Sequence, residues 1–423
     1  MGLLSEDAKR DQLIYGLVFG IACVIFIIAV AVLNIESEVM KDRFTNSQDL
    51  LDGNLHNLEY PPLVLVLIAI PRVFAGTPFG YSIGFVAEMF VFFVIGLLIV
   101  SKFAKRYGKD EKRCMLAYTV LMLIMIEFVV DRFDIVPAVL ALAAVYCYVT
   151  KRYTLAFALL AMGTMIKIYP AVLFPVFMVP LIMDRNWNEI LKGTGVFAVV
   201  SLAVIVPVLI LQPEMLSEMI SYHADRPLQI ETIASSFIYP FAMLGLTDVW
   251  ISDSTEFGSD NLRGTLPDAA ASILTFVMIA LVIVVCIIYA MILKKLKGMG
   301  SKDDRRYLFA STILIVVMMF VMIGKVFSSQ YLLWIIPPLT VLLMISSDEK
   351  WNRIVFILFA VILAVTQLQF AYNVGYLGGG ENINDIGMMM ILLRNILMIA
   401  LLYYVVKPIC DRYLFTKRPA EPC

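Results

Sequence analysis

Apolar runs of about 15 to 25 residues recur along nearly the whole chain, and they restrict the possible folds severely. Only helices and closed barrels satisfy their own backbone groups in lipid, and a helix needs ~20 mostly apolar residues to cross it. Composition agrees, because 61% of the 423 residues are hydrophobic and 16% are charged. The alternating strands of an outer-membrane barrel are missing from the pattern. The sequence therefore predicts an all-α polytopic membrane protein, with residues 1–423 forming a single integral membrane domain.

Twelve segments are predicted to cross the membrane. They are residues 13–33, 82–101, 114–130, 135–150, 153–166, 168–183, 194–212, 269–293, 307–324, 331–346, 351–371 and 386–406. The first has no small-residue cleavage site after it, so it is predicted to be retained rather than removed as a signal peptide. Several central segments are shorter than ~20 residues and are expected to borrow residues from the turns.

Basic residues decide how a further apolar run, 61–75, is interpreted, because cytoplasmic loops are enriched in lysine and arginine. If this run does not cross, 24 of the 33 basic residues fall on the side of the N-terminus. If it does cross, the clusters at 102–113 and 294–306 move to the outside. The run is therefore predicted to be re-entrant or interfacial. The protein is expected in the plasma membrane, with both termini cytoplasmic.

Two long loops are then extracytoplasmic, residues 34–60 and 212–268, and an amphipathic helix is expected in such an outer loop. The two histidines of the chain, His56 and His223, lie in these loops. The ionisable residues inside the spans also lie in their outer halves. A charge in hydrocarbon costs at least ~2.5 kcal/mol, so such groups line a cavity or pair with a neighbour. The distribution predicts a polar chamber that opens outward.

Three of these intramembrane residues are Glu88, Glu127 and Arg394. The two glutamates are interpreted as internal partners of Arg394 or of other buried polar groups rather than as reactants.

The chemistry that such a chamber favours is transfer of a group from a lipid-linked phosphate. A carboxylate can act as general base toward an acceptor hydroxyl, and cations can neutralise a leaving phosphate. No P-loop, HExxH or CxxC motif occurs, which leaves nucleotide chemistry and zinc hydrolysis without support. No basic nucleic-acid face occurs either, so nucleic acid is not an expected partner. No cofactor is assigned, and dependence on a divalent metal stays open.

Several short stretches, in order along residues 36 to 400, resemble the motifs of the GT-C membrane glycosyltransferases of glycosyltransferase family 87. The stretches are Ser37-Glu38-Val39 through Gly53, Glu59-Tyr60-Pro61-Pro62-Leu63, Arg132-Phe133-Asp134 with Pro137, Lys167-Ile168-Tyr169-Pro170, Tyr222-His223 through Arg226, Leu228-Gln229-Ile230-Glu231, Lys325 through Tyr331 with Trp334 and Pro337, and Arg394-Asn395. Each is short, and their conjunction carries the resemblance.

The resemblance implies a GT-C fold and an inverting transfer of one hexose, with mannose expected, from a polyprenyl-phosphate donor. The acceptor would be a hydroxyl of a glycolipid or a lipid-linked glycan. Two alternatives remain: a transporter or flippase of polyprenyl-linked sugars, and an oligosaccharide ligase of the same superfamily. A transporter is expected to show repeated halves and charges near the bilayer midplane, and neither is evident here.

The resemblance also suggests roles for individual residues. Glu38 and Asp42 are the candidates for the catalytic base, and the choice is open because Glu38 stands at the position of the family's usual aspartate while Asp42 lies one helical turn away. The candidates for binding the donor phosphate or sugar are Lys167, His223, Arg226, Lys325 and Gln330. The supporting polar residues are Glu59, Tyr60, Asp134, Gln229, Glu231 and Arg394. Several have a purely structural alternative. Glu38 and Asp42 could belong to a solvated amphipathic loop helix, and His223 and Arg226 could be ordinary polar loop residues. Lys325 could be a snorkelling interfacial lysine, and Asp134 could cap a helix or mark a turn, which is the favoured interpretation of that residue.

Overall fold

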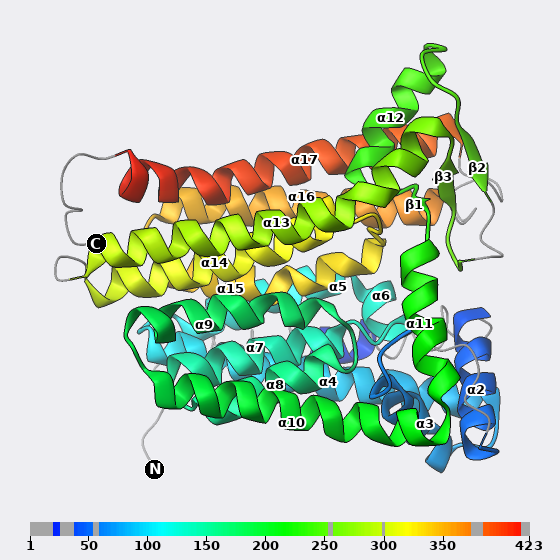
Figure 1. Cartoon of the computed structure of the whole chain (residues 1–423), viewed down its shortest axis with the longest axis horizontal. Coiled ribbons are helices and arrows are strands. Elements are labelled where there is room, and N and C mark those ends of the chain that lie inside the picture. Colours follow the sequence, from blue (N-terminus) through cyan, green and yellow to red (C-terminus); the bar gives the residue numbers. More distant parts are fainter. Residues whose placement is uncertain are drawn as a thin grey trace.

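The computed structural model describes residues 20–25, 38–53, 59–252, 257–297, 301–373 and 384–415, and of residues 38 and 39 it describes the backbone alone. Within these ranges the chain is almost entirely helical. The long helices lie side by side along the longest axis of the molecule (Figure 1).

The first half contains only helices. They are α2 (Glu38–Leu51), α3 (Val64–Phe74), α4 (Pro78–Arg106), α5 (Glu111–Ile124), α6 (Ile126–Asp131), α7 (Ile135–Val149), α8 (Tyr153–Thr164), the 3-10 turn η1 (Tyr169–Val172), α9 (Leu173–Met183), α10 (Trp187–Leu211) and α11 (Pro213–Asp225).

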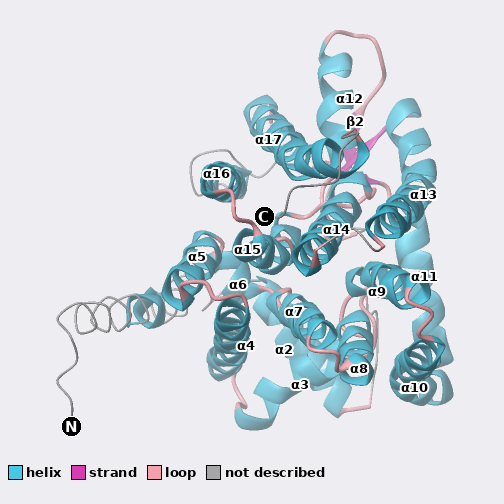
Figure 2. Cartoon of the chain, turned by 90° about the vertical axis from the view of Figure 1, so that its left-hand side faces the viewer, coloured by secondary structure: helices cyan, strands magenta, loops and turns pink. Residues whose placement is uncertain are grey.

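The second half adds three short strands to its helices. Its elements are β1 (Leu228–Gln229), α12 (Ile233–Met243), β2 (Trp250–Ser252), β3 (Asn261–Arg263), α13 (Thr265–Leu296), α14 (Lys302–Ile323), the 3-10 turn η2 (Ser329–Trp334), α15 (Ile336–Ile345), α16 (Glu349–Asn373), α17 (Asp385–Ile409) and the π-helical turn η3 (Cys410–Leu414). Viewed end-on, α13, α14, α16 and α17 lie on one side, α4, α7, α8 and α10 lie on the other, and α15 lies between them (Figure 2).

Local sequence explains where the helices begin. Thr77 caps α4 by accepting a hydrogen bond from the Gly80 amide at 3.2 Å, and Pro78 follows at the first helical position, where its missing N–H costs nothing. Ser301 and Asp304 form a reciprocal capping box at the start of α14. Each cap therefore marks the residue at which a long, mostly apolar helix begins.

The predicted spans coincide with helices in the described part of the chain. Residues 114–130, 168–183 and 331–346 are each divided into two elements, α5 and α6, η1 and α9, and η2 and α15. Of the first predicted span, 13–33, only residues 20–25 are described, and they are helical. Six helices among the described residues are long and apolar enough to cross a membrane: α4, α10, α13, α14, α16 and α17 with η3. The multi-pass helical fold is confirmed, whereas the count of twelve spans stays a prediction.

The run 61–75 forms α3, which has 11 residues and contains Pro71. At 1.5 Å per residue it is about 16 Å long, well short of the ~30 Å of a hydrocarbon core. It packs against α2 and α4. Its length fits the prediction that this run does not cross, and its re-entrant or interfacial placement stays a prediction.

Charged turns gather at the left-hand end of the bundle in Figure 1, where α9 leads into α10 and α13 ends. Arg305 pairs with Asp184 at 2.8 Å across this end. Lys109 donates to the Ser346 carbonyl at 3.4 Å, so α4 and α15 end here as well. This is the end that the basic residues predict to be cytoplasmic.

The opposite, right-hand end carries α2, α3, α11 and the strands (Figure 1). The strands form an antiparallel sheet of order β1-β3-β2, with Leu228 opposite Leu262 and Ile251 opposite Leu262. Gly264 joins β3 to α13 at a φ of 138°, and a Cβ there would lie 2.2 Å from the Asp248 carbonyl oxygen, so only glycine fits. The described chain is nearly all helical, as predicted, and the small sheet was not predicted, because strands of two or three residues leave no alternating pattern to detect.

The predicted orientation can be tested by thiol labelling. Asp225 at the right-hand end and Lys350 at the left-hand end are both exposed. In a protein freed of its native cysteines, Asp225→Cys should react with an impermeant thiol reagent added to intact cells, because it faces outward, and Lys350→Cys should not. Labelling of Lys350→Cys in sealed cells would show that the orientation is inverted.

Candidate active site

Two neighbouring cavities lie at the right-hand end of the bundle, between α11 and the ends of the membrane helices. The first has a volume of about 250 Å³, and we name it the cation cavity after its basic residues. These are Lys167, His223, Arg226 and Lys325. Its other side is largely apolar and includes Met278 of α13 and Phe320 of α14. It therefore combines positive charge with a surface that suits an acyl chain.

The second cavity has a volume of about 360 Å³, and we name it the carboxylate cavity after its four acidic residues. These are Asp42, Glu59, Asp134 and Glu231. The guanidinium groups of Arg43, Arg132 and Arg226 and the amides of Asn46, Gln229 and Gln330 also line it. Such a lining offers many hydrogen bonds to hydroxyl groups.

The two cavities share a wall. Glu59, Tyr60, Arg226 and Tyr331 line both of them. The two cavities therefore lie next to each other, and the larger is in the size range of ordinary ligand pockets, ~300 to 1,000 Å³.

Helix α2 carries Asp42 to the carboxylate cavity. The helix is anchored by the buried Arg43, which donates to the Asp131 carbonyl and lies 4.6 Å from the centroid of the Phe85 ring. Asp42 itself is exposed, and the structure gives it no ion pair or hydrogen bond with any described residue. A carboxylate in that position is free to accept a proton from a ligand.

Glu38, the other candidate base, is the first residue of α2 and lies one turn before Asp42. Its side chain is outside the described part of the structure, as is the whole of His56. Asp42 lines the carboxylate cavity, and the choice between Asp42 and Glu38 as the base stays open.

The cations reach their cavity from two loops. Lys325, between α14 and η2, donates to the Ala224 carbonyl at 2.8 Å. Arg226, directly after α11, donates to the Ser259 hydroxyl at 2.8 Å, and its Nε is buried without a hydrogen-bond partner among the described residues. Burial lowers the pKa of Lys325, and the neighbouring Asp225 opposes this shift. A bound anion would offer Lys325 and Arg226 the hydrogen bonds that burial from water has taken from them.

His223 lies beside these cations on α11. Its Nε2 is 2.8 Å from the Glu59 carbonyl oxygen, and because a carbonyl only accepts, Nε2 carries the proton. Burial lowers the pKa of His223, and the nearby Arg226 and Lys325 act in the same direction. The hydrogen bond to Glu59 opposes this shift, and it holds α11 against the Glu59 backbone.

Lys167 and Asp134 form a buried ion pair between the two cavities. Their side chains are 7% and 2% exposed, and Nζ lies 2.6 Å from Oδ1 of Asp134. The same oxygen accepts from the Trp334 indole at 2.9 Å. Asp134 stands at the start of α7, but its side chain makes no capping hydrogen bond, which corrects its interpretation as a helix cap.

Glu231 is held by the fully buried Arg394 of α17. The guanidinium lies 2.6 Å from the Glu231 carboxylate and also donates to the Glu231 carbonyl. The Ser329 hydroxyl donates to the same carboxylate at 2.6 Å. Arg394 thus pairs with Glu231. The sequence had suggested Glu88 and Glu127 as its partners, or as partners of other buried polar groups.

Gln229 connects β1 to the loop that carries Lys325. Its backbone amide donates to the Lys325 carbonyl at 3.0 Å, and its side-chain amide donates to the Ser328 hydroxyl, also at 3.0 Å. Gln330 lines the carboxylate cavity two residues further on. Apart from Glu38, every residue that the sequence predicted for this site lies at these cavities or binds a residue that does.

The sequence profile of Glycosyltransferase family 87 matches residues 58–324, which is more than half of the chain and includes most of the residues described above. The chain belongs to glycosyltransferase family 87.

This family-87 protein is also similar in structure to ArnT from Cupriavidus metallidurans bound to undecaprenyl phosphate. The two sequences are 13% identical, the match covers 94% of this chain and 78% of that chain, and the TM-score is 0.49. Among curated proteins none matches the sequence at a significant level.

Some residues of this family-87 site were not singled out from the sequence. Arg43 and Asn46 gave no signal, because a polar segment between apolar runs is most simply read as a solvated loop. Arg132, Tyr331 and Trp334 stood inside the recognised motifs without a role of their own. No group of three or more side chains suited to a metal ion occurs in the part of the chain that is described.

Proposed function

We propose that this membrane glycosyltransferase moves a single hexose, with mannose expected, from a polyprenyl phosphate to a hydroxyl of a glycolipid or lipid-linked glycan at the outer face of the membrane. The observation that supports this most is the junction of two cavities of opposite character. One joins cations to an apolar wall, as a lipid phosphate needs, and the other offers a free carboxylate to a hydroxyl.

In the proposed reaction, Asp42 takes the proton of the acceptor hydroxyl, and the hydroxyl oxygen attacks the anomeric carbon. The bond between that carbon and the phosphate oxygen breaks, and its electron pair leaves with the polyprenyl phosphate. Attack opposite the leaving group inverts the anomeric centre. Lys325 and Arg226 stabilise the charge that grows on the phosphate.

The direct test is turnover by the purified protein in detergent, with a polyprenyl-phosphate hexose and a glycolipid acceptor. A glycosylated acceptor and free polyprenyl phosphate are the expected products. A transporter would form no product under these conditions, and an oligosaccharide ligase would require a pyrophosphate-linked glycan. Either outcome would contradict the proposal.

Removal of a donor cation should weaken use of the donor. A hydrogen bond between charged groups contributes ~1.5 to 3 kcal/mol, so Lys325→Met or Arg226→Met should reduce kcat/KM for the donor roughly ten- to a hundredfold. We expect kcat to fall along with apparent affinity, because the charge develops on the departing phosphate.

Steady-state kinetics at varied donor and varied acceptor would check this prediction, with Lys350→Met at the opposite end of the bundle as the matched control. The KM for the acceptor should change little. Normal donor kinetics in both cavity variants would mean that the donor phosphate binds elsewhere.

A further inference from the structure

Three aromatic rings form a continuous stack beside the two cavities. The Tyr169 and Trp334 centroids are 4.1 Å apart at an interplanar angle of 6°, and the Trp334 and Tyr331 centroids are 4.0 Å apart at 18°. Tyr169 belongs to η1, and the other two rings belong to η2. The stack therefore forms where the 3-10 turns η1 and η2, which precede α9 and α15, come together.

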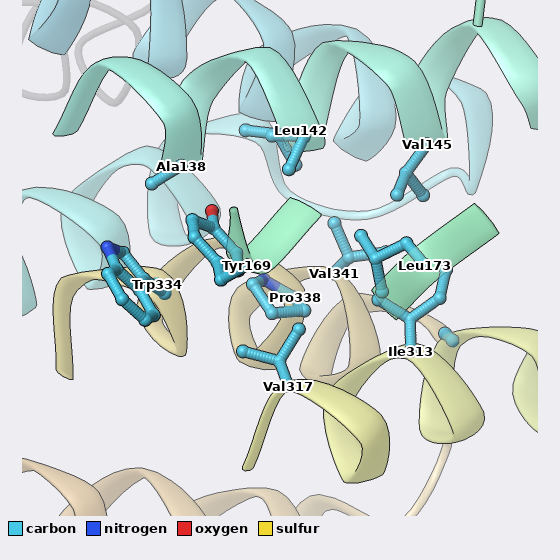
Figure 3. A pocket seen from close by; sticks show the side chains of 12 residues that line it. Ala138, Leu142, Val145, Tyr169, Leu173, Ile313, Val317, Trp334, Pro338 and Val341 are labelled. Carbon is cyan, nitrogen blue, oxygen red and sulfur yellow. The ribbon is translucent and has the colours of Figure 1, made fainter. Parts of the chain in front are cut away.

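One side of this stack is closed. Tyr169 and Trp334 border a small apolar gap that is also lined by Leu142 and Val341 (Figure 3). The gap measures about 20 Å³, which is space for a water-sized molecule. This gap is too small for a sugar. All three rings also line the cation cavity, and Tyr331 is the ring of the stack that lines the carboxylate cavity as well.

The rings are held in place by the buried ammonium of Lys167. Its nitrogen lies 5.1 Å from the Tyr60 centroid, 5.0 Å from that of Tyr331 and 5.2 Å from that of Trp334. These distances are those of cation–π contacts. Because Asp134 neutralises the ammonium and also accepts from the Trp334 indole, the pair fixes the rings and is not itself free to bind a phosphate.

We propose that Tyr331, with Tyr60 beside it, forms the platform on which the hexose ring of the donor lies, and that Lys167 is a positioning residue for this platform. The inference rests on the proposed function. In an inverting displacement the sugar lies between the leaving phosphate and the attacking hydroxyl. Tyr331 lines both the cation cavity, where the phosphate would bind, and the carboxylate cavity, where the hydroxyl would bind. A pyranose has an apolar C–H face, which an aromatic face binds well.

The test compares the donor with its own product. In Tyr331→Leu, the KM for a polyprenyl-phosphate hexose should rise roughly tenfold, since the ring face is lost. The inhibition constant of sugar-free polyprenyl phosphate should stay within about twofold, because the ring serves the sugar alone. Tyr331→Phe keeps the ring face, so its KM for the donor should rise much less than that of Tyr331→Leu. Equal weakening of both ligands, or of neither, would overturn the platform.

A second measurement needs no turnover. The chain has four tryptophans, and replacing Trp187, Trp250 and Trp351 by phenylalanine leaves Trp334 as the sole reporter. Its fluorescence should change when the hexose donor binds and change much less with polyprenyl phosphate. Identical responses to both ligands would contradict the proposal. If the parent protein transfers no hexose from the lipid, the proposed function fails; if it does and Tyr331→Leu keeps its KM, only the platform fails.

Discussion

Replacing Asp42 with asparagine should slow hexose transfer by at least ~10²-fold, the scale on which a lost general base acts. The asparagine keeps the shape of the side chain and loses the ability to take a proton. Since Asp42 is exposed and pairs with no described residue, the variant should fold normally. The rate of hexose transfer is measured with purified protein, donor and acceptor. Size-exclusion profiles check that the variant is folded.

Two further variants of α2 make the test specific. Asp49→Asn changes the same chemistry on the same helix at a position away from the cavities and should retain the parent rate. Glu38→Gln reports on the other candidate. If Asp42→Asn and Glu38→Gln both keep normal rates, neither residue is the base, and Asp134 and Glu231 are next, although ion pairs already occupy both carboxylates.

The largest loss of stability is expected from Arg394→Met. Arg394 is fully buried and binds both the carboxylate and the carbonyl of Glu231, so the substitution leaves a carboxylate that is 14% exposed without its cation. Breaking a buried ion pair from one side costs about 3–5 kcal/mol. Equilibrium unfolding in mixed micelles should show this as a reduced free energy of unfolding.

The exposed Arg353→Met on α16 is the matched control, for which we expect a change within about 0.5 kcal/mol. Adding Glu231→Gln to Arg394→Met removes the orphaned charge and should restore part of the lost stability. If the single variant is as stable as the parent, the Glu231 segment is held by its other contacts, such as the hydrogen bonds from Asn395.

The membrane helices could be predicted because the property that defines them, apolar length, is local. The exclusion of the short α3 from the spans was inferred instead from the distribution of lysine and arginine along the whole chain, and it stays a prediction. The sheet could not be found in this way. Its three strands have only two or three residues each, and β1 depends on a strand far along the chain, as where Gln229 faces Asn261, so none of them has a pattern of its own.

The site was predictable as a set of residues and not as a set of contacts. Motifs identified Glu231 and Arg394, but nothing in the sequence indicates that two residues 163 positions apart form an ion pair. Glu88 and Glu127 were therefore interpreted as partners of Arg394 or of other buried polar groups. Lys167 was likewise predicted to bind the donor phosphate or sugar from its charge, and its buried ion pair with Asp134 could not be seen in the sequence. Pairing depends on the packing of helices, which single-sequence patterns do not contain.

The length of α13 gives the site its depth. The helix begins at Thr265, and Thr275 and Met278 line the cation cavity about 15 and 20 Å further along its axis. The cation cavity therefore lies well below the start of α13, and in the proposed function protein and acyl chains would surround a sugar ester that is bound there. An activated sugar ester held at that depth is sheltered from hydrolysis, because exclusion of water suppresses the competing reaction. A loaded enzyme can then wait for a scarce acceptor without wasting its donor.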